Sequence, residues 1–147
     1  MLNERGDCFC ERIIYPDVES IETNTGLKEF DILSFTIHYT FSYFNLVDML
    51  KKAEVPVLRK DRTNDDPLII AGGPIVTANP MPLSDFIDIF FIGDGEYALN
   101  DFLDLYNKFE NPRDHLEEFA KIEGLYIPEL NSSVEFKLYQ ASGRRST

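Results

Sequence analysis

The stretch that most constrains the fold of this chain is residues 68–96, where two apolar runs each end in glycines. The run Leu68–Ala71 is followed by Gly72–Pro74, and the run Ile87–Ile92 is followed by Gly93–Glu96. Short apolar strands that stop at glycines before a helix are typical of a parallel α/β sheet. Ligands of such sheets lie at the carboxyl ends of the strands. The stretch therefore predicts both the fold class and the place where a site would lie.

Other segments extend this pattern. Residues 31–38 are rich in β-branched and aromatic residues and predict the first strand. A helix is predicted from Phe41 to about Glu54, and the longest helix from Asp94 or Gly95 to just before Pro112. The first helix is expected to bury Phe41, Phe44, Val47 and Leu50, and the longest one a stripe that begins at Tyr97. Weaker patterns predict a short strand or an extended arm at 12–15, strands at 55–58, 125–128 and 134–139, a helical turn at 82–85 and a helix at 113–122.

These elements predict a three-layer Rossmann-like α/β domain with a mainly parallel sheet of about four to six strands. We expect an N-terminal arm and connection over residues 1–30 and the α/β domain over residues 31–128. Residues 129–147 are expected to form a C-terminal extension, whose polar end at 141–147 has the composition of vector-derived residues.

The charge of the chain excludes one class of partner. Its 26 acidic and 14 basic residues give a formal net charge of −12. Nucleic acids and anionic membranes bind clustered Lys and Arg, so neither is expected as a partner. The sequence lacks an apolar run of the length that spans a bilayer, and its first residues are charged, so we expect no membrane span and a cytoplasmic location.

The cysteines, histidines and acidic residues of the sequence give little support to a metal site or a catalytic site. Cys8 and Cys10 are expected to be a reduced pair, and a metal bound there would need ligands from elsewhere. The two histidines, His38 and His115, are too few for a histidine-rich metal site. The acids Asp31, Asp88 and Asp94 show no paired-carboxylate or Ser/His/Asp spacing. No catalytic residue and no metal ligand is predicted.

Each glycine motif has two interpretations. Gly72–Pro74 forms either a tight turn or a place where a second backbone or a ligand approaches closely. It lacks the Lys-Ser/Thr of a P-loop and the third glycine of a dinucleotide fingerprint. Gly93–Glu96 either caps a helix through Asp94 or binds an anion at the helix start, although its two acids repel a bare phosphate.

Three segments of the chain resemble the amino-terminal region of B12-binding-type radical SAM proteins, which are often described as Fe–S oxidoreductases. The segments are CERIIYPD (10–17), FDILSFTIHYTFSYFNLVDML (30–50) and PLIIAGGPIVTANPMPLSDFIDIFFIGDGE (67–96). The resemblance covers roughly residues 8–110. It implies a cobalamin-binding-like Rossmann domain placed before a TIM-barrel-like radical SAM domain, which would be the partner of this domain.

The resemblance also implies cofactors and their residues. Ser34 and Thr36 match a strand-end hydroxyl position, and Gly72 and Gly73 match the glycine pair along the nucleotide tail of the corrinoid. The parent family implies a 4Fe–4S cluster and S-adenosylmethionine bound outside this chain. The residues expected to bind cobalamin are Ser34, Thr36, Gly72, Gly73, Pro74, Gly93, Asp94, Gly95 and Glu96.

Three family features are missing. The D-x-H-x-x-G motif that supplies the lower cobalt ligand is absent, and His38 lies on a different element. Met81 stands where relatives carry an acid in the N-P-E-P loop. The C-x-x-x-C-x-x-C motif of the radical SAM cluster is absent as well, so this chain by itself is not expected to be an enzyme.

Three hypotheses follow. The first is a non-catalytic, cobalamin-binding-like accessory domain that covers the catalytic barrel of a radical SAM enzyme and shapes substrate access. The second is a degenerate Rossmann-like module that binds no cofactor and mediates domain or subunit contacts. The third is a stand-alone enzyme that uses Asp94 and Glu96 with a metal ion.

Overall fold

The computed structural model describes residues 2–130. Within them one sheet has the strand order β1-β2-β3-β4. The first three strands are parallel, and β4 pairs antiparallel with β3. The sheet therefore confirms the predicted mainly parallel α/β class. The strands are β1 (Ile32–Thr36), β2 (Leu68–Gly72), β3 (Ile89–Phe91) and β4 (Leu125–Tyr126).

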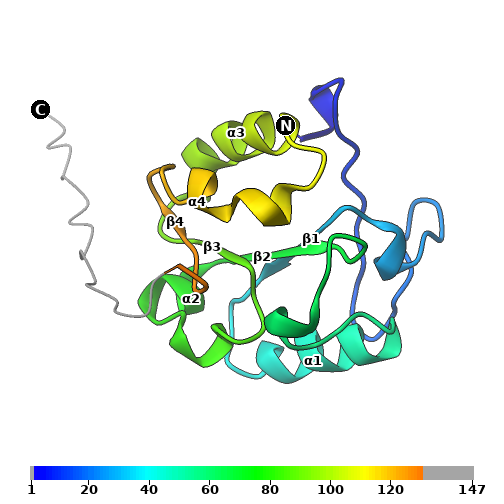
Figure 1. The fold of residues 1–147 in the computed structure, drawn as a ribbon. Helices are drawn as coiled ribbons and strands as arrows, with labels where there is room; N and C mark the ends of the chain where they lie inside the picture. The colour runs from blue at the N-terminus through cyan, green and yellow to red at the C-terminus, as the bar shows by residue number, and fades with distance from the viewer. Residues whose placement is uncertain (1, 131–147) are drawn as a thin grey trace, which may run out of the picture.

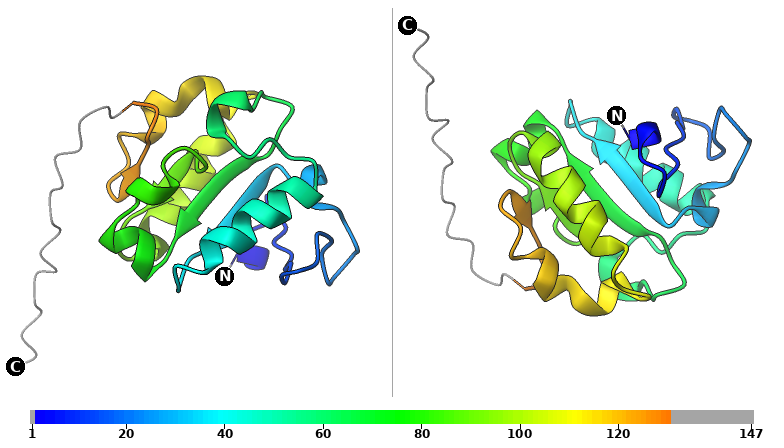
Figure 2. Two further views of the ribbon diagram at one scale, coloured as in Figure 1. Left: turned by 90° about the horizontal axis from the view of Figure 1, so that it is seen from below. Right: turned by 90° about the horizontal axis from the view of Figure 1, so that it is seen from above.

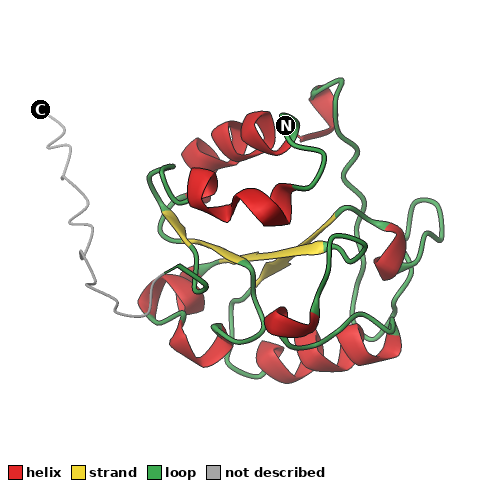
Figure 3. Cartoon of the chain, in the orientation of Figure 1, coloured by secondary structure: helices red, strands yellow, loops and turns green. Residues whose placement is uncertain are grey.

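Helices cover both faces of the sheet, so the predicted three layers are present (Figure 1). The helix α1 (Ser42–Lys52) follows β1, and the short α2 (Pro74–Ala78) follows β2 on the same face. On the opposite face lie α3 (Gly95–Tyr106), which follows β3, and α4 (Leu116–Phe119), which precedes β4 (Figure 3). Short 3-10 turns occur at Leu2–Glu4, Leu27–Glu29, Arg59–Asp61, Met81–Leu83 and Pro112–His115.

The central strand β2 shows why the apolar runs become strands. Its side chains alternate, with Ile69 and Ala71 packed on the α1 face and Leu68 and Ile70 on the α3 face. All four are buried, as expected for a parallel strand covered on both sides.

The buried face of α1 differs from the prediction. Its buried residues are Leu46, Met49 and Leu50, whereas Phe41 and Phe44 are exposed to solvent. Leu46 and Leu50 lie four residues apart and so share one face, and the position of α1 under the sheet turns Phe44 away from that face. The expectation that Phe41 and Phe44 are core residues is wrong.

Several shorter predictions also need correction. Of the two alternatives for residues 12–15 the strand does not form, and residues 55–58 are not a strand either. The helix α2, which was not predicted, begins at Pro74 directly after the glycines. The strand β3 covers only the centre of the predicted run 87–92, and α3 ends at Tyr106 instead of near Pro112. Tyr97, expected in the buried stripe of α3, is exposed. The predicted strand 134–139 lies outside the described residues, as do residues 141–147.

The N-terminal arm packs on the domain. Arg5 donates hydrogen bonds to Asp104 and Asn100 on α3, and it also pairs with Asp7. Farther along the arm, Leu27 is buried in the core on the α1 face. Contacts on both sides of the sheet thus hold the segment before β1 in place.

Candidate functional site

The carboxyl edge of the sheet gathers the glycine motifs from separate parts of the chain. Because β1, β2 and β3 are parallel, the segments that follow them all begin at one edge (Figure 2). The segment after β1 leads into α1, the one after β2 into α2, and the one after β3 into α3. The two last helices lie on opposite faces of the sheet. Open α/β sheets bind ligands where the connections after neighbouring strands run to opposite faces of the sheet, as they do here after β2 and β3.

Gly73 is required by the fold itself. Its φ is +109°, and a Cβ atom added there would lie 2.7 Å from the carbonyl oxygen of Ile37. Ile37 in turn donates its N–H to the carbonyl of Gly72 at 2.8 Å. The close approach predicted at this motif is therefore made by the chain's own backbone, so Gly73 offers little open surface to a ligand.

The two glycine motifs meet at one side chain. A Cβ atom added at Gly72 would lie 3.6 Å from Cβ of Phe91, and one added at Gly95 would lie 3.5 Å from the same atom. Phe91 is buried and points into the α3 layer. The end of β2 and the start of α3 thus both pack on Phe91, at distances where an added Cβ would make ordinary van der Waals contact.

The segment after β3 confirms helix capping. The Asp94 side chain accepts a hydrogen bond from the N–H of Glu96 at 3.4 Å, as the capping interpretation expects. Gly93 has a φ of +81° with open space where a Cβ would stand, and its N–H donates to Oγ1 of Thr77 on α2 at 3.0 Å. Gly93 is consequently the glycine of this edge whose surface is free for a close approach.

Exposed aromatic side chains surround the same edge. Tyr39, Phe41 and Phe44, which follow β1, are 74%, 79% and 74% exposed, and Tyr97 at the start of α3 is 82% exposed. Large apolar groups left in water mark surfaces that contact another molecule or domain. Sequence reasoning missed this feature because it assigned Phe41, Phe44 and Tyr97 to the core.

The remaining predicted cofactor residues lie on the outer strand. Ser34 and Thr36 are exposed on β1, which is at the edge of the sheet and two strands away from β3. Ser34 lines an apolar groove of about 370 Å³ between β1, α3 and the N-terminal arm. Residues 72–74 and 93–96 do not line this groove. They also do not line a second hollow, which lies at the amino ends of the strands.

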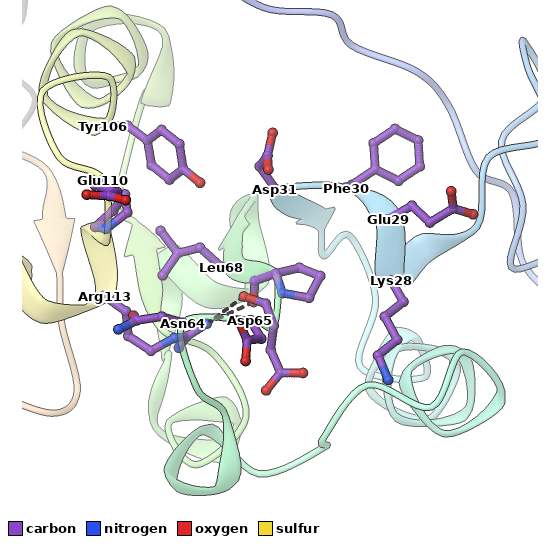
Figure 4. A pocket seen from close by; sticks show the side chains of 13 residues that line it. Lys28, Glu29, Phe30, Asp31, Asn64, Asp65, Leu68, Tyr106, Glu110 and Arg113 are labelled. Atoms are coloured by element: carbon purple, nitrogen blue, oxygen red, sulfur yellow. Dashed lines mark hydrogen bonds between the residues drawn. The ribbon is translucent and has the colours of Figure 1, made fainter.

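The second hollow lies at the amino edge of the sheet and is strongly acidic. It measures about 220 Å³, and Asp31 and Tyr106 stand on one side of it with Arg113 opposite (Figure 4). Arg113 is already engaged, because it donates to the carbonyls of Thr63 and Pro67. This edge therefore has no free guanidinium from Arg113 to offer an anion.

A buried ion cluster lies behind that hollow. Asp88, which is fully buried, accepts hydrogen bonds from Arg62 at 3.0 Å, from Arg113 at 2.6 Å and from the N–H of Ile69 at 2.8 Å. Arg62 also donates to the carbonyls of Pro56 and Val57. These bonds hold residues 55–58 as a loop and explain why the strand predicted there does not form. Burial lowers the pKa of Arg62, against the opposing attraction of Asp88.

The other candidates are not assembled into a reactive site. Cys8 and Cys10 are free thiols, and the described residues contain no group of three or more His, Cys, Asp or Glu that would hold a metal ion. His115 stacks on Phe109 with the ring centroids 4.1 Å apart, and His38 stays beside Tyr39. The described helices include none that is both long and apolar enough to cross a membrane.

The sequence matches known proteins over most of its length. A family model described as "Radical SAM proteins, N-terminal" matches residues 1–128. "Uncharacterized protein MJ0966" of Methanocaldococcus jannaschii is 34% identical over 76 residues, which are 52% of this chain and 16% of that relative. The chain thus corresponds to a small part of that relative's length. No solved structure matches significantly. With its parallel α/β sheet and a match over 128 residues, the chain belongs to the family of N-terminal regions of radical SAM proteins.

Proposed function

We propose that this domain is a non-catalytic, cobalamin-binding-like accessory domain of a radical SAM protein, with the carboxyl edge of its sheet facing the catalytic part. The S-adenosylmethionine and the 4Fe–4S cluster that the family implies belong outside this chain. The C-x-x-x-C-x-x-C motif that the resemblance implies for this cluster has three cysteines, and this chain has two. The proposal includes a cytoplasmic location.

The observation that carries the proposal is the exposure of Tyr39, Phe41, Phe44 and Tyr97 around the carboxyl edge. This edge is also where open parallel sheets receive ligands. A surface of aromatic rings beside loops that begin with glycine fits contact with a large, flat or extended group or with a neighbouring domain.

The residues fit a corrinoid tail in part. Gly93 has open space at its Cα, and Gly95 and Glu96 follow at the start of α3. Gly73, by contrast, is covered by Ile37. A bound tail would therefore lie over Gly93 and the segment after β3, and not against Gly72 or Gly73, which Phe91 and Ile37 cover. Cobalamin would supply a cobalt centre, and this chain's part would be to bind and orient the tail.

A second candidate function is a Rossmann-like module that binds no cofactor and only contacts the catalytic domain. It is favoured by the backbone of Ile37, which fills the space beside Gly73, and by the absence of residues 72–74 and 93–96 from the two hollows described above. The same exposed aromatic side chains would then pack directly on the neighbouring domain.

Titration of the 147-residue chain with hydroxocobalamin separates these two functions. We expect a change in the visible spectrum of the corrinoid and a rise in the melting temperature of the protein. Glu96→Trp should weaken binding at least about tenfold by covering the segment after β3, since each factor of ten corresponds to about 1.4 kcal/mol. Asp101→Trp, five residues farther along α3 and also exposed, is the matched control.

Two results decide the outcome. An unchanged spectrum and melting temperature at high micromolar hydroxocobalamin would remove the corrinoid function and leave the contact module. Binding that is weakened equally by both Trp variants would place the corrinoid elsewhere and overturn the assignment of this edge.

A further inference from the structure

The outer edge of β1 is unpaired. β1 is the first strand of the sheet order and pairs only with β2. The N–H of Leu68 donates to the carbonyl of Asp31, and the N–H of Ile37 donates to the carbonyl of Gly72. These two bonds determine which alternate residues direct their backbone groups toward β2. They are Asp31, Leu33, Phe35 and Ile37. The alternate residues of β1 direct their N–H and C=O groups outward; they are Ile32, Ser34 and Thr36.

No charge, proline or bulge within β1 protects this edge, and the N-terminal arm, which lines the groove beside it through Cys8, Phe9 and Cys10, makes no backbone hydrogen bond to it within the described residues. Sheet edges are usually blunted by charged residues, proline, bulges or very short strands. β1 is a five-residue strand of sequence ILSFT and has none of these. Within residues 2–130, no hydrogen bond joins the outward backbone groups to another segment. In doubly wound sheets the first strand normally lies inside the sheet, with a further strand beside it.

The surroundings of this edge are apolar on both faces. The groove of about 370 Å³ is lined on the α3 face by Ile32, Phe102 and Leu103. On the α1 face it is lined by Leu33 and Met49. At its rim stands Phe9, which is 92% exposed. A strand placed beside β1 would thus be covered on both sides, and such strands are continuous apolar runs.

We propose that a short, uncharged, apolar strand from the downstream part of the radical SAM polypeptide pairs with β1 and completes the sheet. The proposal rests on membership of the N-terminal family and on the length of the relative, of which the matched part is 16%. Most of such a polypeptide lies beyond this domain and is available to supply the strand. Backbone bonds to Ile32, Ser34 and Thr36 would provide affinity, and side chains alternating into the groove would provide specificity.

Amide hydrogen exchange tests this inference. In the 147-residue chain alone, the amides of Ile32, Ser34 and Thr36 should exchange quickly, whereas those of Leu33, Phe35 and Ile37 should be protected by β2. In the intact radical SAM protein the first three should exchange at least about tenfold more slowly, because they become part of a paired ladder. Equal rates in the two proteins would overturn the proposal.

Variants at the edge make the test specific. Ser34→Pro removes an outward N–H without removing a bond to β2, so it should restore fast exchange of Ile32 and Thr36 in the intact protein. Ser34→Ala is the matched control and should leave the protection unchanged. Thr36→Lys adds an edge charge and serves if the proline variant does not fold. Protection retained in all variants would overturn the pairing.

Sedimentation of the isolated chain tests whether a second copy of this chain supplies the strand that pairs with β1. A concentration-dependent dimer that is lost in Ser34→Pro would identify a second copy as the strand donor and overturn the downstream origin. A monomer agrees with it. Because none of these readouts involves hydroxocobalamin, a failure of the corrinoid function and a failure of this pairing are seen independently.

Discussion

The amino edge of the sheet contains a buried ion cluster, whereas the carboxyl edge contains exposed aromatic rings and glycines. At the amino edge, Asp88 is buried between Arg62 and Arg113, and its carboxylate is engaged by both side chains and by the backbone of Ile69. At the carboxyl edge, the chain places glycines and exposed aromatic rings, and Asp94 and Glu96 stay in solvent. The comparison indicates that the amino edge serves stability and that the carboxyl edge is free for contact with another group.

The largest effect is expected from breaking the amino-edge cluster. Asp88→Ala leaves Arg62 buried without its counter-charge, which should lower the free energy of unfolding by about 3–5 kcal/mol. Urea denaturation measures this loss. Asp65→Ala, an exposed acid in the nearby loop, should change stability by less than about 0.5 kcal/mol. Similar values for both variants would show that the cluster does not stabilise the fold.

An effect of comparable size is expected from Gly73→Val at the carboxyl edge. The backbone strain of a non-glycine residue at φ +109° and the clash with the Ile37 carbonyl should each cost about 1–3 kcal/mol. Thermal or urea unfolding gives the sum. Gly72→Ala is the control, because its Cβ meets nothing nearer than 3.6 Å. If Gly73→Val were as stable as Gly72→Ala, the close approach of Ile37 would be irrelevant to stability.

A smaller effect should follow from changing the exposed aromatic surface. Phe44→Gln should alter the free energy of unfolding by less than about 0.5 kcal/mol, because the ring is 74% exposed. Phe102→Ala on α3, whose ring is fully buried, should cost about 3–5 kcal/mol. A large loss in Phe44→Gln would mean that this ring belongs to the core after all.

The smallest effect concerns alkaline pH at the amino edge. Burial, with the charge of Asp31 as a second cause, raises the pKa of the Tyr106 hydroxyl in the folded state. The folded protein therefore holds this proton more tightly, and the associated stability is present below about pH 10 and lost as the pH rises through the folded pKa. Tyr106→Phe should remove this part of the alkaline slope in urea denaturation. An unchanged slope would contradict it.

Local patterns in the sequence were sufficient to determine the layers of the domain. Apolar runs of strand length that stop at glycines, followed by helical patterns, were sufficient to predict β1, β2, β3, α1 and α3. Asp94 was recognised as a cap because capping depends on residues two or three positions away. The sequence also carried a signal for the ion cluster, since Asp88 stands between two apolar residues and a buried charge requires a partner.

Tertiary structure decided what each of these residues contacts. Arg62 and Arg113 lie 26 and 25 positions from Asp88, so no local pattern could identify them as its partners. Phe44 and Phe102 are the same residue type on helices, and only the way each helix packs on the sheet leaves one ring exposed and buries the other. The glycines of 72–73 were visible in the sequence. That Gly73 receives the backbone of Ile37 followed only from the pairing of β1 with β2, because burial and close contact are properties of the assembled sheet.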